Sequence, residues 1–219
     1  MNSRLDLARH NMVENQVRTW DVLDARVLDV LAQLPRDAFV PEPYKALAYA
    51  DVALPIGDDQ IMLKPVVEGR ALQALLPLPH ERVLEIGTGT GYFAACLARL
   101  AARVTTIDCR AAFVTSAAQK LARVGITNVE CAHADALDGF APAEAFDAIA
   151  VTGAVATLPT VFTNWLAPAG RLFVIRGTQP AMQAVLLRRA ADGNFNEERL
   201  FETDAPYLSG AEFAPTFQL

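Results

Sequence analysis

The sequence predicts an α/β fold built around a doubly wound, mostly parallel β-sheet. From Arg82 onward, short apolar runs typical of buried strands alternate with longer amphipathic stretches typical of helices. Repeated strand–helix–strand units of this kind build parallel sheets. One of the strands also runs directly into a glycine-rich turn followed by a helix, which is the usual position of a ligand-binding loop in such folds.

The expected elements follow from the apolar periodicity along the chain. The N-terminal region should be helical, with a second helix that Asp24 caps and Pro35 ends. Residues 54–65 hold two prolines and a glycine and are expected to form a loop, after which Pro65 opens another helix. The seven strands are expected at residues 83–86, 104–107, 129–131, 146–151, 171–176, 184–189 and 199–203, and the remaining helices at 92–100, 111–123 and 158–166.

Length and composition favour one domain overall, with residues 1–65 as an N-terminal helical extension packed on a core of residues 66–219. The 219 residues are 53% hydrophobic and carry a net charge of −6, and no run of Lys or Arg exceeds a pair. Nucleic acid is therefore not expected as a partner. No apolar stretch reaches the length of about 18 residues that a membrane span needs, so a cytoplasmic protein is expected.

The three cysteines and three histidines show no spacing typical of a disulfide framework or a metal site. The cysteines lie far apart and odd in number, so no disulfide framework is expected. No histidine has a cysteine or carboxylate at metal-ligand spacing, so no metal site is expected.

The glycine-rich segment around residues 83–92 is the most informative part of the chain. A buried strand leads into Gly87, Gly89 and Gly91 and then into a helix. Glycines allow a turn with positive φ and let a ligand lie against the backbone. A dinucleotide fingerprint needs Gly or Ala at the sixth position of the motif, where this chain has Tyr92, and this argues against NAD.

Three acidic residues at the ends of successive strands favour S-adenosylmethionine (SAM) as the ligand. Glu85 precedes the first glycine and could face the cationic groups of SAM, Asp108 could accept both ribose hydroxyls, and Asp135 could meet the adenine amino group. A plain tight turn would not need these acids. The expected cofactor-binding residues are Glu85, Gly87, Thr88, Gly89, Gly91, Asp108, Cys109, Asp135, Ala136 and Thr152.

Three blocks resemble the protein-L-isoaspartate O-methyltransferase family over residues 10–178. The first combines Pro-Arg-Asp-Ala-Phe-Val-Pro at residues 35–41 with Leu-Pro-Ile-Gly at 54–57, the second is the glycine segment, and the third is Phe-Asp-Ala-Ile-Ala-Val-Thr-Gly at 146–153. The first block is the more family-specific. The resemblance implies a class I methyltransferase fold and SAM-dependent methylation of the carboxylate of isoaspartyl residues in proteins or peptides, which is a protein-repair activity.

The segment that borders the methyl acceptor departs from the family pattern. Where the family reads Gly-Gln-Thr-Ile-Ser-Gln-Pro, with a serine thought to orient the acceptor carboxylate, residues 59–65 read Asp-Gln-Ile-Met-Leu-Lys-Pro. No catalytic residue is assigned, but Gln60, Leu63 and Lys64 are expected to border the acceptor. Lys64 is either a solvated charge or a replacement clamp for a carboxylate.

The loss of both hydroxyls predicts weak methylation of isoaspartyl peptides and leaves two alternatives open. The chain could be a methyltransferase with a different acceptor, or a SAM-binding module without transferase activity. The sequence assigns neither the oligomeric state nor a role for residues 178–219.

Overall fold

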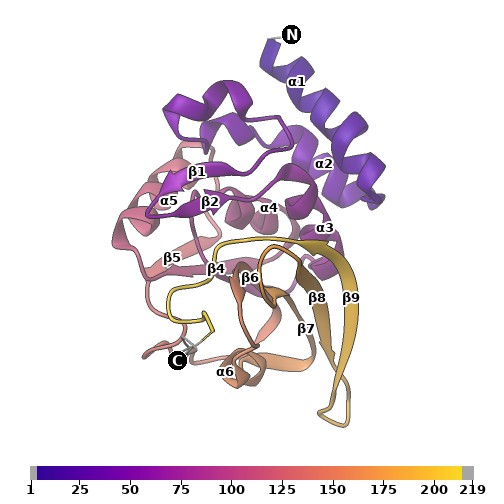
Figure 1. Cartoon of the computed structure of the whole chain (residues 1–219), viewed down its shortest axis with the longest axis vertical. Coiled ribbons are helices and arrows are strands. Elements are labelled where there is room, and N and C mark those ends of the chain that lie inside the picture. The colour runs from indigo at the N-terminus through magenta and orange to yellow at the C-terminus, as the bar shows by residue number, and fades with distance from the viewer. Residues whose placement is uncertain (1–3, 214–219) are drawn as a thin grey trace, which may run out of the picture.

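A computed structural model describes residues 4–213 and shows the seven-stranded, mostly parallel sheet that the sequence predicts (Figure 1). The strand order is β5-β4-β3-β6-β7-β8-β9; the first five strands are parallel, and β8 and β9 join antiparallel. The strands are β3 (Arg82–Ile86), β4 (Arg103–Asp108), β5 (Val129–His133), β6 (Phe146–Val155), β7 (Leu166–Arg176), β8 (Met182–Arg189) and β9 (Phe195–Thr203).

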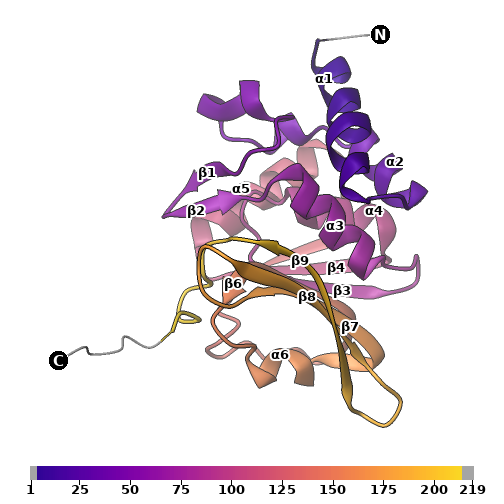
Figure 2. The same ribbon diagram turned by 45° about the vertical axis from the view of Figure 1, so that its right-hand side comes forward.

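Helices cover both faces of this sheet (Figure 2). Helices α2 to α5 lie on one face and α6 on the other. Successive strand residues point to opposite faces, so Val83 joins the apolar cluster under α2, α3 and α4, while Leu84 joins the cluster around Phe162 and Trp165. The helices are α1 (Arg4–Met12), α2 (Ala25–Gln33), α3 (Pro65–Leu75), α4 (Tyr92–Leu100), α5 (Ala111–Arg123) and α6 (Thr160–Asn164).

The N-terminal region is helical, as predicted. Helix α1 continues through a π-helical segment, Val13–Val17, and a 3-10 turn, Arg18–Trp20. The predicted cap of α2 is confirmed, because an Asp24 carboxylate oxygen accepts hydrogen bonds from the backbone N–H groups of Arg26 and Val27.

The expectation of a loop over residues 54–65 is wrong. These residues form a β-hairpin of β1 (Leu54–Gly57) and β2 (Gln60–Met62), which pair antiparallel. The turn between them is made by Asp58 and Asp59, both with positive φ. Aspartate tolerates this conformation better than most residues, so the pair of acids can fill the two central positions of the turn, directly after Gly57.

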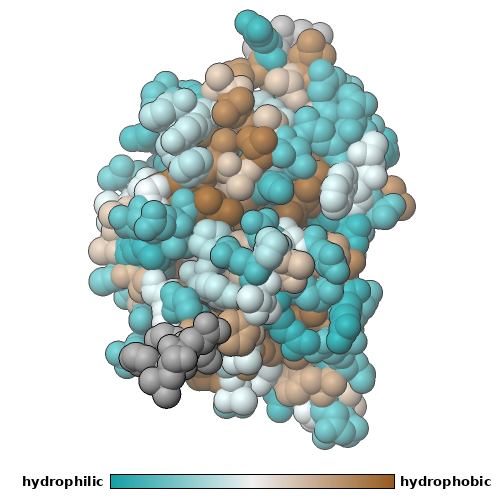
Figure 3. All heavy atoms as spheres, in the orientation of Figure 1, coloured by the Kyte–Doolittle hydropathy of each residue, from teal (hydrophilic) through white to brown (hydrophobic). Residues whose placement is uncertain are grey.

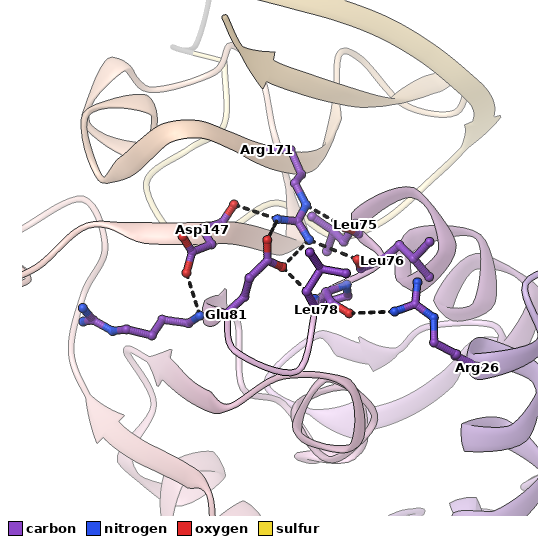
Figure 4. Close-up of polar contacts among 9 residues, drawn as sticks. Arg26, Leu75, Leu76, Leu78, Glu81, Asp147 and Arg171 are labelled. Carbon is purple, nitrogen blue, oxygen red and sulfur yellow. Dashed lines mark hydrogen bonds and ion pairs between the residues drawn. The ribbon is translucent and has the colours of Figure 1, made fainter. Parts of the chain in front are cut away.

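A buried ion pair closes the edge of the sheet where the parallel strands begin. The Arg171 guanidinium donates at 2.7 Å to each carboxylate oxygen of Glu81, and also to the carbonyl oxygens of Leu75, Leu76 and Asp147 (Figure 4). These contacts join β3, β6 and β7 to the end of α3. The opposite edge, where the strands end, is left for a ligand site.

Exposed apolar side chains are concentrated in the part of the chain that precedes β1. Figure 3 shows brown side chains gathered on the upper half of the face seen in Figure 1. The large apolar residues exposed in this part of the chain are Leu5, Leu7, Trp20, Leu23, Leu47 and Val52. Among the residues described, no helix combines the length and apolar character needed to cross a membrane.

Candidate functional site

A cavity lies at the edge of the sheet where the parallel strands end, between the glycine-rich segment and the β1–β2 hairpin. The empty space in it, together with open solvent at its mouth, is about 650 Å³. The lining residues come from β1 and β2, from the ends of β3 to β5, from α5, from β6 and from the C-terminal segment: Ile56, Gln60, Ile61, Ile86, Gly87, Gly89, Ile107, Asp108, Cys109, Arg110, Phe113, Ala134, Asp135, Ala136, Leu137, Thr152, Gly153, Pro206, Leu208 and Ser209.

The glycine turn brings bare backbone to the floor of this cavity. Gly87 has a φ of +104°, and a Cβ at this position would lie 2.5 Å from Oγ1 of Thr152. That hydroxyl donates to the carbonyl oxygens of Ile86 and Gly87 and so ties the turn to β6. A larger residue than glycine would break this contact.

Asp108 is placed where the sequence predicts it, at the end of β4 on the cavity wall. Its side chain is buried, and its two carboxylate oxygens accept hydrogen bonds from the backbone N–H groups of Gly89 at 3.1 Å and Arg110 at 3.0 Å. Each carboxylate oxygen has a second lone pair. Asp108 can therefore hold the glycine turn and still accept from two neighbouring hydroxyls of a ligand.

Asp135 lies on the cavity wall beyond the end of β5, beside Ala136 and Leu137. Its Oδ1 accepts from the backbone N–H of Leu137 at 2.8 Å. Among the described residues no donor reaches Oδ2. An acceptor next to apolar side chains suits a flat heterocycle that carries an amino group.

Glu85 does not line the cavity. It is buried inside the sheet, where Oγ1 of Thr106 donates to its Oε2 at 2.5 Å and in turn lies 2.7 Å from Oγ1 of Thr88 in the glycine turn. Its other oxygen, Oε1, is buried without a hydrogen-bond partner. Burial raises the pKa of Glu85 to about 8, against the opposing effect of the Thr106 hydrogen bond.

The geometry thus gives Glu85 an indirect relation to the cavity, through the hydroxyls of Thr106 and Thr88. Thr88 and Gly91 belong to the glycine turn but do not line the cavity. Seven of the ten residues expected to bind the cofactor line the cavity: Gly87, Gly89, Asp108, Cys109, Asp135, Ala136 and Thr152.

The hairpin forms the roof, and only part of it faces the cavity. Gln60 and Ile61 line it, whereas Leu63 is buried in the main apolar cluster. Lys64 lines a different cavity, with Trp20 and Arg70. Of the three residues expected to border the acceptor, Gln60 lies on the wall of the cavity that the glycine turn also lines. Leu63 and Lys64 lie outside this cavity.

Sequence reasoning missed the residues that the C-terminal segment adds to the cavity. Pro206, Leu208 and Ser209 reach it because the segment pairs with β6, where Ala154 exchanges backbone hydrogen bonds with Pro206 and Leu208. No local sequence pattern marks such a pairing. Arg110 was also missed, although its position two residues after Asp108 could have suggested it.

Comparisons with known proteins agree with this geometry. The family described as protein-L-isoaspartate(D-aspartate) O-methyltransferase matches residues 8–205. A protein-L-isoaspartate O-methyltransferase of Methanoregula boonei is 42% identical over 208 residues, which cover 94% of this chain and 91% of that protein. One from a Roseiflexus species is 40% identical over 190 residues, covering 86% of this chain and 87% of that protein.

The fold is also that of a solved structure, a protein-L-isoaspartate O-methyltransferase of Plasmodium falciparum in complex with S-adenosyl-L-homocysteine. The TM-score is 0.79 at 19% identity, over 91% of this chain and 97% of that one. At this identity the likeness concerns the fold alone, whereas the family is shown by the closer sequence matches. The chain belongs to the protein-L-isoaspartate(D-aspartate) O-methyltransferase family and is a SAM-dependent methyltransferase of the class I fold.

Proposed function

We propose that the chain transfers the methyl group of SAM to the carboxylate of isoaspartyl residues in proteins and peptides. The observation that carries the proposal is a single cavity bordered by both the glycine turn and the β1–β2 hairpin. The family match spans both of these segments. The cavity therefore offers a place where cofactor and acceptor meet.

The residues of the cavity fit the cofactor. Asp108 would accept the two ribose hydroxyls, and Oδ2 of Asp135 would accept from the adenine amino group beside Ala136. The backbone at Gly87 and Gly89 would lie against the methionine part. Glu85 would act through Thr106 and Thr88, by holding the glycine turn in shape.

The transfer needs little acid–base chemistry from the chain. When bound, SAM would supply an electrophilic methyl group to an acceptor carboxylate oxygen and would leave as S-adenosylhomocysteine. No proton has to move. The chain's contribution is to align the acceptor and to exclude water, for which Ile56, Ile61 and Leu208 form apolar walls.

We expect slow transfer, because residues 61 and 63 lack the hydroxyls of the family pattern and residue 61 lies on the cavity wall. Ile61 faces the cavity where the family has threonine. Leu63 stands where the family has serine, with its side chain buried and its carbonyl turned to Arg36. A charge-assisted hydrogen bond to the acceptor is worth about 1.5–3 kcal/mol, or roughly 10- to 150-fold in rate if it forms only in the transition state.

The test compares an isoaspartyl peptide with its aspartyl isomer, using radiolabelled SAM. We expect slow, isoaspartyl-selective turnover by the native chain and a gain of about tenfold or more in the double variant Ile61→Thr and Leu63→Ser. Because residue 61 lines the cavity, Ile61→Thr alone should give more of this gain than Leu63→Ser alone.

Three other outcomes would change the interpretation. Fast native turnover with no gain in any variant would show that the hydroxyls are not needed. Equal turnover of both peptides would remove the isoaspartyl specificity. SAM binding without turnover in any variant would favour a different acceptor or a purely binding role.

We also propose that this activity serves protein repair in the cytoplasm, with no nucleic-acid or membrane partner. Its support is the family match, together with the net charge of −6, which disfavours a phosphate-backbone partner. Cell fractionation and the isoaspartyl content of proteins in cells that lack the chain would test it.

A further inference from the structure

Arg36 is a fully buried charge that the transfer chemistry above does not use. It lies in the Pro-Arg-Asp-Ala-Phe-Val-Pro block and has 0% of its surface exposed. Burial of an unpaired charge is costly, so its contacts decide its role. Its nitrogens all find partners from other segments of the chain.

Two contacts of Arg36 lie on either side of the β1–β2 hairpin, which is called the acceptor hairpin below. Nη2 donates to the carbonyl oxygen of Leu63, just after β2, at 2.6 Å, and Nη1 donates to that of Ala48, before β1, at 2.7 Å. Arg36 therefore holds the chain directly after the hairpin, at Leu63, and six residues before it, at Ala48. Gln60 and Ile61, which face the cavity, lie between these two points.

The remaining contacts anchor Arg36 to α3 and to the start of α4. Nε donates to Oε2 of Glu68 in α3 at 3.1 Å, and the guanidinium lies 5.4 Å from the ring centroid of Tyr92. Tyr92 is the first residue of α4, directly after Gly91. Burial raises the pKa of Glu68 to about 7, while the charge of Arg36 acts in the opposite direction.

Building on the methyl transfer proposed above, we propose that Arg36 is a positioning residue that fixes the position of the acceptor hairpin relative to the glycine turn. One planar group joins the segments before and after the hairpin to α3 and to the start of α4. Lysine has a single point charge and cannot match three acceptors in this spread geometry. Misplacement of a reacting group by about 1 Å can cost about 100-fold in rate.

The chain offers a matched control in Arg171. Like Arg36, Arg171 is a buried arginine that binds one carboxylate and several backbone carbonyls, as Figure 4 shows. It lies at the edge of the sheet where the parallel strands begin, away from the cavity. Arg171→Lys should therefore cost stability without moving the hairpin.

The experiment measures transfer kinetics, S-adenosylhomocysteine affinity and amide hydrogen exchange on the full-length variants Arg36→Lys and Arg171→Lys, below their melting temperatures. For Arg36→Lys we expect kcat/KM for the isoaspartyl peptide to fall by about tenfold or more, with S-adenosylhomocysteine affinity within about threefold of the native value. Amide exchange at residues 60–64 should be faster. For Arg171→Lys the kinetics and the exchange at residues 60–64 should match those of the native chain.

A purely structural Arg36 would give a different pattern. Equal kinetic effects of the two variants, or no faster exchange at residues 60–64 in Arg36→Lys than in Arg171→Lys, would overturn the positioning role. The exchange measurement needs no acceptor. Absence of isoaspartyl turnover by the native chain would thus refute the proposed acceptor, while exchange alone would still decide the role of Arg36.

Discussion

Asp108 shows how one residue can serve both the fold and a ligand. Its carboxylate fixes the backbone of Gly89 and Arg110 and also faces the cavity. Glu85 differs, because it does not line the cavity and reaches the glycine turn only through two hydroxyls. The sequence placed both acids at strand ends but not the register of the strands, which pairs Glu85 with Thr106 and so puts Asp108 two residues further towards the cavity.

Asp108→Ala is expected to weaken S-adenosylhomocysteine binding by about 1–3 kcal/mol, because the ribose hydroxyls lose their acceptor in a buried site. Titration calorimetry measures this change. Asp108→Asn, which keeps one acceptor oxygen, should lose less. Asp192→Ala, in the exposed β8–β9 turn, is the control and should bind as the native chain does. Unchanged affinity in Asp108→Ala would show that the ribose lies elsewhere.

At the scale of elements, the sequence predicted what depends on local pattern. All seven strands of the sheet and the capped helix α2 were predicted at the right places in the chain. The β1–β2 hairpin was not, because its turn uses two aspartates with positive φ. The C-terminal segment was also missed as part of the site, because its pairing with β6 is non-local.

The contact between glycine turn and hairpin can be tested with Gly89→Val. Gly89 has a φ of +48°, and a Cβ there would lie 3.4 Å from Cδ1 of Ile56 in β1. A branched side chain would strain the turn and fill cofactor space, so we expect binding of S-adenosylhomocysteine to be lost with the fold retained.

Gly125→Val is the matched control for this change. Gly125 also has a positive φ, but its Cβ would meet nothing within 4 Å, and it does not line the cavity. Both variants should lose stability, which circular dichroism can follow, yet only Gly89→Val should lose the ligand. Retained binding in Gly89→Val would mean that the turn serves only as a connection between β3 and α4.

At the scale of the whole molecule, two buried arginine clusters brace opposite parts of the structure. Arg171 joins the strands where they begin, and Arg36 joins the hairpin and helices above the cavity. Neither cluster could be derived from sequence spacing, because the partners lie far apart along the chain. Glu85 is a further buried ionisable residue, and none of its hydrogen-bond partners is a cation.

The burial of Glu85 makes the stability of the molecule depend on pH. Its pKa is raised to about 8 in the folded chain, from a value of 4.5 for an unperturbed glutamate. The folded state therefore holds a proton that the unfolded state releases between these two pH values. The contribution of this proton to the free energy of unfolding is present in full below about pH 4.5. It decreases by about 1.4 kcal/mol per pH unit as the pH rises from there towards 8.

Glu85→Gln mimics the protonated carboxyl and removes this titration. Urea unfolding from pH 5 to pH 8 should show a smaller loss of stability in the variant than in the native chain, because only the native chain must ionise or retain a proton at this site. Groups that titrate equally in both proteins cancel in the difference. Parallel curves would show that Glu85 has similar pKa values in both states, and a steeper loss in the variant would contradict the sign of the shift. Since Glu85 supports the glycine turn through Thr106, cofactor affinity should also vary less with pH in the variant.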